Sequence, residues 1–176
     1  MSTLKVLVSP SDHVQGDAGA ACTLVEYGDY ECPHCGHAYP IVKQIQKHLG
    51  KRLRFVFRNF PLNESHPHAE SAAETAEFAG AHGKFWDMHD LLFENQDRLS
   101  GELYLGLAQE LELAPTELRL ALEEGKYRTR VHSDFTGGVR SGVNGTPTFF
   151  INGQRHDGPF EYEDLLEAIE EALAEA

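Results

Sequence analysis

The hydrophobic residues near the N-terminal end of the chain follow a strand–helix–strand pattern. Residues 22–28, CTLVEYG, form a short apolar and β-branched run closed by a glycine, which predicts a buried strand. A helix is predicted next, because aliphatic residues recur at helical spacing over residues 41–49 and Gly50 follows them. Residues 53–60, LRFVFRNF, predict a second strand. Together these elements indicate a βαβ unit, which is almost always right-handed.

The middle of the chain has helical rather than strand-like spacing. Small alanines form one stripe, later segments are amphipathic, and Pro115 and Thr116 are residue types expected where a helix begins. The helices are expected over residues 72–79, 83–93, 101–113, 114–125 and, more weakly, 127–143.

Strands return at residues 146–153, TPTFFING. The Asn-Gly pair is a hairpin-turn signal, so residues 149–151 and 154–156 are predicted to pair antiparallel. A final amphipathic helix follows, with acidic residues in its first turn, where the helix dipole favours them. The pattern predicts one α/β domain over residues 1–176, with a βαβ half, an all-helical insertion at approximately 66–143, and a ββα half.

The composition and charge of the chain argue against several classes of partner. The formal net charge is -13, from 28 acidic and 15 basic residues, and this argues against nucleic acid or an anionic membrane surface as the main partner. No stretch approaches the roughly 20 apolar residues of a membrane span, so membrane insertion is not expected. With 176 residues, the chain is long enough for one substantial core.

The N-terminus and the cysteine count suggest a compartment. The apolar run at residues 4–8 is shorter than the roughly 7–15 residues of a secretory signal, and three cysteines are too few for a disulfide scaffold. We therefore expect a cytoplasmic protein, or a periplasmic or extracellular one if a leader has been removed.

The strongest chemical signal is Cys32-Pro33-His34-Cys35, at the start of the first predicted helix. Exposed backbone N–H groups at a helix N-terminus stabilise a thiolate, and a protonated His34 adds positive charge beside Cys32. Pro33 suits the first helical turn, where a missing N–H costs nothing. A zinc site needs four ligands, whereas this motif supplies two and the ten histidines are scattered, so no metal is predicted.

Two distant motifs together carry a family resemblance. EYGDYECPHC, followed far downstream by GVNGTPTFFING, resembles the DsbA-like thiol–disulfide oxidoreductases, which have a thioredoxin fold with a helical insertion. Pro40 matches the helix-kinking proline of the superfamily. The resemblance spans nearly the whole chain. It implies that Cys32 is an exposed attacking thiol and that Cys35 resolves the mixed disulfide.

The resemblance also implies roles for three other residues. Glu26 matches a buried acidic residue beneath the active site, where a raised pKa would let it accept the Cys35 proton through water. The alternative is an edge-strand carboxylate that faces solvent. Thr146 and Pro147 match the cis-proline site, whose backbone can pair with an extended substrate strand. The alternative is a trans turn proline.

Several other residues have ordinary structural interpretations. Cys22 is expected to be a buried or edge residue rather than a regulatory thiol, and Trp86 to pack between helices rather than to form a substrate platform. His37 either tunes the cysteine pair or is simply solvated on its helix.

The leading hypothesis is an enzyme that exchanges disulfides with protein substrates and needs no cofactor. Its expected partners are proteins with thiols or disulfides and an unidentified redox recycling partner. The alternatives are a glutathione-dependent transferase or isomerase, and a redox-sensing or binding module without turnover. Thr146 is more usual in isomerase-like or reducing relatives than in strong oxidases, so the direction of electron flow stays open.

Overall fold

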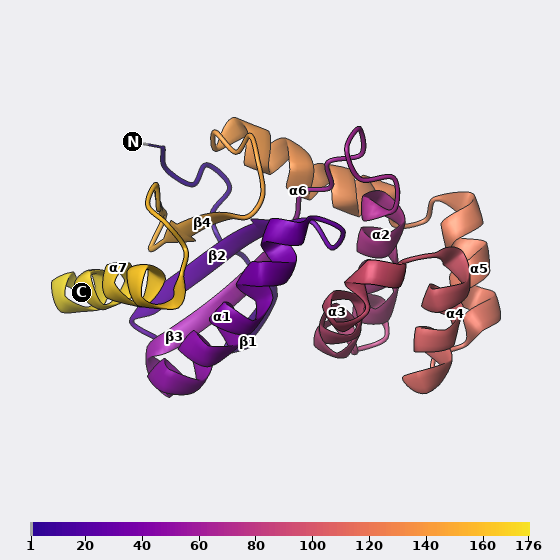
Figure 1. Ribbon diagram of the computed structural model, residues 1–176, viewed down its shortest axis with the longest axis horizontal. Helices are drawn as coiled ribbons and strands as arrows, with labels where there is room; N and C mark the ends of the chain where they lie inside the picture. The colour runs from indigo at the N-terminus through magenta and orange to yellow at the C-terminus, as the bar shows by residue number, and fades with distance from the viewer. Residues whose placement is uncertain (1) are drawn as a thin grey trace.

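The computed structural model describes residues 2–176 and contains one mixed sheet with helices on both faces (Figure 1). The strands are β1 (His13–Gly16), β2 (Cys22–Gly28), β3 (Leu53–Asn59), β4 (Thr148–Ile151) and β5 (Gln154–Arg155). The α-helices are α1 (Pro33–Leu49), α2 (Ala69–Ala81), α3 (Phe85–Glu94), α4 (Gly101–Glu110), α5 (Pro115–Glu124), α6 (Arg128–Arg140) and α7 (Tyr162–Glu175).

The sheet has the order β1-β3-β2-β4-β5. Strands β2 and β3 are parallel, as a βαβ unit requires, and β4 runs antiparallel to β2. The β4–β5 hairpin forms at Asn152-Gly153, where both residues have positive φ (47° and 84°), as a type I′ turn needs. The predicted thioredoxin fold with a helical insertion is confirmed.

Strand β2 is buried on both faces because it lies in the middle of the sheet. Leu24 belongs to the larger hydrophobic core, which α1, α3 and α7 cover, whereas Val25 and Tyr27 belong to a smaller core that includes Phe135 of α6. Side chains alternate between the two faces of a strand, so Glu26 points to the same side as Leu24, toward α1.

Helices α2 to α5 form the lobe on the right of Figure 1, and α6 returns from it across the sheet. The predicted helices correspond to α2–α6 in order, with boundaries that differ by a few residues. The first helix begins earlier than the hydrophobic spacing alone indicated, at Pro33, and continues through Pro40.

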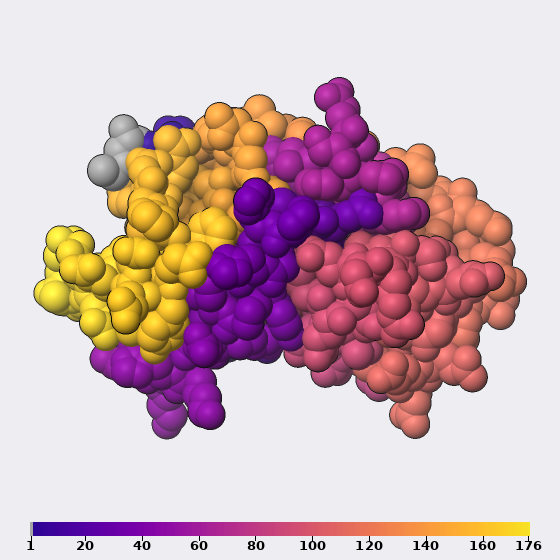
Figure 2. Space-filling model, viewed as in Figure 1, coloured from indigo at the N-terminus to yellow at the C-terminus, as the bar shows by residue number. Residues whose placement is uncertain are grey.

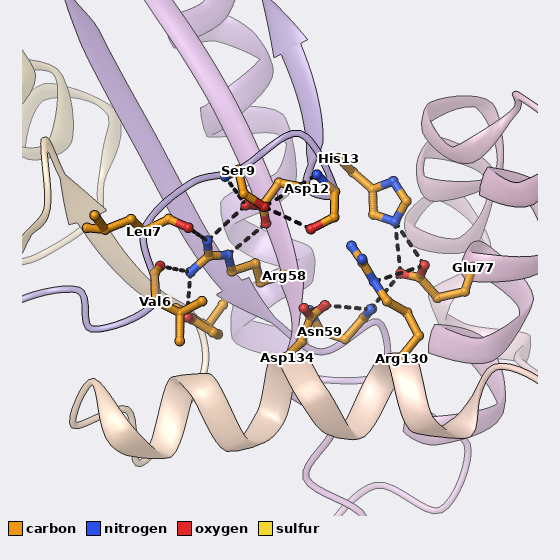
Figure 3. A network of polar contacts seen from close by, with 12 residues as sticks. Val6, Leu7, Ser9, Asp12, His13, Arg58, Asn59, Glu77, Arg130 and Asp134 are labelled. Carbon is orange, nitrogen blue, oxygen red and sulfur yellow. Dashed lines mark hydrogen bonds and ion pairs between the residues drawn. The ribbon is translucent and has the colours of Figure 1, made fainter.

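Strand β1 was not predicted. Its four residues are half-buried or exposed and carry no strong apolar alternation, and they form a strand because β3 offers an open antiparallel edge. A buried Arg58 on β3 helps to hold this N-terminal segment (Figure 3). Its guanidinium donates to both carboxylate oxygens of Asp12, at 2.8 and 2.9 Å, and to the carbonyl of Val6 at 2.7 Å.

A cluster of hydrogen-bonded polar side chains lies beside this ion pair, between β3, α2 and α6. Glu77 of α2 accepts hydrogen bonds from His13 Nε2 at 2.9 Å and from Asn59 Nδ2 at 2.8 Å. The Asn59 amide also donates to Asp134 of α6 at 3.0 Å, while Arg130 lies 3.5 Å from Glu77. These bonds join the first strand, the sheet and the helical insertion.

Candidate active site

Cys32 and Cys35 lie at the start of α1. Cys32 caps the helix with extended backbone (φ −69°, ψ 122°), and Pro33 takes a first-turn position, as predicted. Cys35 is fully buried. The predicted exposure of Cys32 is wrong: the residue is only 3% exposed, and its Sγ lies 3.5 Å from the Thr146 carbonyl oxygen, so the Thr146 loop covers it.

The pKa of Cys32 is lowered from 9.0 to about 5. The largest cause is a hydrogen bond from the Cys35 thiol, which burial partly opposes; Thr146 and the backbone N–H groups of Cys35 and His34 add to the lowering. The Thr146 hydroxyl is buried and has no hydrogen-bond partner among residues 2–176, so it is free to donate to a thiolate. The first turn of α1 therefore stabilises the thiolate as a helix N-terminus should.

His34 lies in the first turn of α1 with an exposed side chain, and its backbone N–H is among the groups that lower the pKa of Cys32. The effect of a protonated His34 imidazole stays a prediction.

Glu26 lies beneath the cysteine pair and is 3% exposed, so the solvent-facing alternative does not apply. Its Oε2 atom has no hydrogen-bond partner among residues 2–176. Burial raises the pKa of Glu26 to about 8, and the Cys32 thiolate adds to the shift. The pKa of Cys35 is raised well above its ordinary value, first by burial, then by its bond to Cys32 and the charge of Glu26.

A cavity of about 10 Å³ adjoins Glu26, and Tyr39 and His89 also line it. This volume is close to the minimum that one water molecule requires. Neither cysteine lines this cavity, so it gives Glu26 room for water on a side of the carboxyl away from the pair. A buried carboxyl with a raised pKa is the kind of group that can accept a proton near pH 7.

The bond between Thr146 and Pro147 is cis. The Thr146 carbonyl faces Cys32 Sγ, so the structure brings these two residues to the cysteine pair from a segment more than 100 positions away. They lie just before β4, which pairs with β2, the strand that precedes the cysteine motif.

Asp29 is a residue of the site that sequence reasoning missed. Its carboxylate is fully buried and accepts hydrogen bonds from the backbone N–H groups of Glu31 (2.8 Å), Cys32 (3.2 Å) and Leu62 (2.9 Å). His66 Nδ1 lies 2.8 Å from the same carboxylate. The backbone N–H of Asp29 also donates to Cys35 Sγ at 3.4 Å. The signal available was an aspartate, a common turn residue, directly after a predicted strand.

The remaining candidates have structural roles. Cys22 is fully buried, and burial raises its pKa to about 11, which makes it unreactive. His37 pairs with Glu161 at 2.8 Å, and Trp86 packs against the core and donates to the Val14 carbonyl. Within residues 2–176, no group of three or more His, Cys, Asp or Glu side chains is arranged to hold a metal ion.

Comparison with known proteins gives one family. The family model described as Thioredoxin matches residues 8–171. The oxidised crystal structure of BdbD from Bacillus subtilis is 27% identical, with a TM-score of 0.83 and 93% of each chain covered. A thioredoxin-like oxidoreductase from Silicibacter pomeroyi is 26% identical, with a TM-score of 0.79 and 96% of this chain and 95% of that chain covered.

The curated relatives are larger proteins. A Na(+)/H(+) antiporter NhaA 1 from Salinispora arenicola is 44% identical over 172 residues, which are 97% of this chain and 26% of that protein. The chain thus spans about a quarter of the length of the curated relatives it matches. None of the helices described over residues 2–176 has both the length and the apolar character of a membrane span.

Proposed function

The chain belongs to the thioredoxin family, in its DsbA-like group, and from this premise we propose that it exchanges disulfides with substrate proteins through Cys32 and Cys35. The observation that carries the proposal is the unequal environment of the pair. Cys32 stands at a helix N-terminus with a pKa of about 5, whereas Cys35 is buried above an unpartnered Glu26. We treat residues 1–176 as one domain in which the segment at about 66–143 is the helical insertion.

In the reducing direction, the Cys32 thiolate attacks one sulfur of a substrate disulfide. The substrate S–S bond breaks, a mixed disulfide forms with Cys32, and one substrate thiolate leaves. Glu26, as carboxylate, then takes the Cys35 proton through water, and Cys35 attacks the Cys32 sulfur. The second substrate thiolate leaves, so the substrate gains two electrons and the enzyme holds a Cys32–Cys35 disulfide.

The same steps in reverse oxidise a substrate dithiol. A stabilised Cys32 thiolate favours the reduced enzyme, and this makes the Cys32–Cys35 disulfide a stronger oxidant. We therefore propose oxidation of protein dithiols as the favoured direction, with a separate redox partner that restores the disulfide. Thr146 and Pro147 would hold the substrate backbone beside Cys32, and His34 and Pro33 would shape the first turn of the helix.

Reduction of insulin disulfides, followed by turbidity with dithiothreitol as electron donor, tests the activity in either direction because the exchange steps are shared. We expect turnover by the native protein, and loss of it in Cys32→Ser and Cys35→Ser. Cys22→Ala is the matched control, since it removes the third, unreactive cysteine, and it should retain turnover. Insulin reduction that survives in Cys35→Ser would contradict the resolving role of Cys35. Turnover in a separate glutathione-conjugation assay would favour a glutathione-dependent enzyme, and no turnover by the native protein in either assay would favour a sensor.

The compartment is a separate proposal. The cytoplasm expected from the sequence would keep the pair reduced, whereas an oxidising compartment would support the proposed direction. Alkylation of cell extracts with a thiol-specific mass label separates the two. A fully reduced pair supports the cytoplasm, and an oxidised pair contradicts it.

A further inference from the structure

The reactive turn has no side-chain cap of its own within the described residues 2–176. Cys32 is the N-cap residue of α1, yet its side chain makes no capping hydrogen bond. An N-cap serine or aspartate would usually hold the first turn with its own oxygen, whereas this thiol is occupied by Cys35 and Thr146. Within the helix, the Gly36 N–H donates to the Cys32 carbonyl at 3.0 Å, and the remaining support of the turn comes from side chains outside the helix.

Two side chains supply that support: one binds backbone N–H groups of the turn, and the other binds its backbone carbonyls. Asp29 accepts hydrogen bonds from the N–H groups of Glu31 and Cys32. Gln96 donates through Nε2 to the carbonyl of Tyr30 at 2.9 Å and to the carbonyl of Cys32 at 2.8 Å. Because carbonyl oxygens only accept, both hydrogens of the Gln96 amide are used, and the orientation of the amide follows.

Gln96 comes from the helical insertion. It begins the short 3₁₀ turn Gln96–Arg98, between α3 and α4, and lies 64 positions beyond Cys32 in the chain. Figure 2 shows the insertion packed directly against the violet surface of α1. Gly36 permits the approach, because a Cβ at this position would overlap the amide of Gln96.

We propose that Gln96 is a positioning residue through which the helical insertion sets the reactivity of Cys32. By holding the carbonyls of Tyr30 and Cys32, it keeps the N–H groups of His34 and Cys35 directed at the Cys32 sulfur. This inference rests on the proposed function, because the reactivity of Cys32 matters only if the pair exchanges disulfides. Its test does not need substrate turnover.

The test is the Cys32 pKa, read from thiolate absorbance against pH in the reduced protein. Gln96→Met keeps the length and packing of the side chain and removes both donors. Its Cys32 pKa should rise by about half a unit to one unit, the scale of one lost hydrogen bond. The potential of the Cys32–Cys35 couple should become less oxidising in step. Arg98→Ala is the matched control, because Arg98 lies in the same turn and, among the described residues, its side chain bonds only to Asn95.

A second variant disrupts the contact between Gln96 and α1 by a change on the helix side. Gly36→Ala should improve the helix itself, yet displace Gln96 and raise the Cys32 pKa by a similar amount. Combined with Gln96→Met, it should add little, since the contact is already lost. An unchanged Cys32 pKa in Gln96→Met, or shifts that simply add in the double variant, would overturn the inference. Inactive native protein with these shifts present would instead count against the proposed function alone.

Discussion

Replacing Glu26 with glutamine should stabilise the protein above acidic pH. Glutamine has the same shape but cannot ionise. The Glu26 pKa of about 8, against an ordinary 4.5, corresponds to about 5 kcal/mol once the carboxyl is ionised in both states. Glu26 is buried, and its Oε2 has no hydrogen-bond partner in the part of the chain that the structure describes, so no bond to that atom offsets the cost.

The sign follows from proton binding. With a raised native pKa, the native state holds a proton that the unfolded state has lost, so stability is full below about pH 4.5 and falls until about pH 8. Glu26→Gln should therefore equal the native protein at pH 4, exceed it by about 3 kcal/mol at pH 7, and by about 5 kcal/mol at pH 9.

Urea unfolding of the reduced proteins at these three pH values measures the effect. The oxidised proteins serve as a control, because burial, the larger cause, remains when the Cys32 thiolate is gone. Equal stabilities at pH 7, or the same gain at pH 4 and pH 9, would refute the reasoning. The variant should also slow the step in which Cys35 attacks, and leave alkylation of Cys32 by a small reagent unchanged.

Two further changes probe the thiolate and the N-terminal ion pair. Thr146→Val removes the hydroxyl that can donate to the thiolate, so the Cys32 pKa should rise by about one unit in thiolate absorbance; an unchanged value would exclude that bond. Asp12→Ala leaves Arg58 buried without its carboxylate and should cost about 3–5 kcal/mol in urea unfolding at pH 7. Burial alone would raise the pKa of Asp12, but bonds from Arg58 and Ser9 outweigh it and lower the pKa, so the native protein should lose this stability as pH falls below about 4. If Asp12→Ala were as much less stable than the native protein at pH 2 as it is at pH 7, this assignment would be contradicted.

The sequence predicted features that depend on local pattern. Cys32 and Cys35 stood out by spacing, and the family resemblance implied the burial of Glu26, which its apolar neighbours on a strand favour. The order of elements predicted a βαβ half, a helical insertion and a ββα half, and the resemblance carried by two separated motifs implied that this is a thioredoxin fold.

Features made by distant segments could not be predicted in the same way. Gln96 looks like an ordinary polar residue, and only the packing of the insertion on α1 brings its amide to the active-site turn. Cys32 was expected to be exposed as the attacking thiol that the resemblance implies, whereas Thr146 covers it from far along the chain. Strand β1 depends on an open edge of β3 rather than on its own residues.

The central claim is that Cys32 and Cys35 form a reversible disulfide couple that is poised as an oxidant. Equilibration of the protein with reduced and oxidised glutathione, followed by alkylation and mass analysis, measures the potential of this couple directly. With a Cys32 pKa near 5, we expect a reversible Cys32–Cys35 disulfide with a potential more oxidising than roughly −270 mV, the value for thioredoxin. A pair that forms no disulfide over the accessible range, or one more reducing than that value, would contradict the account.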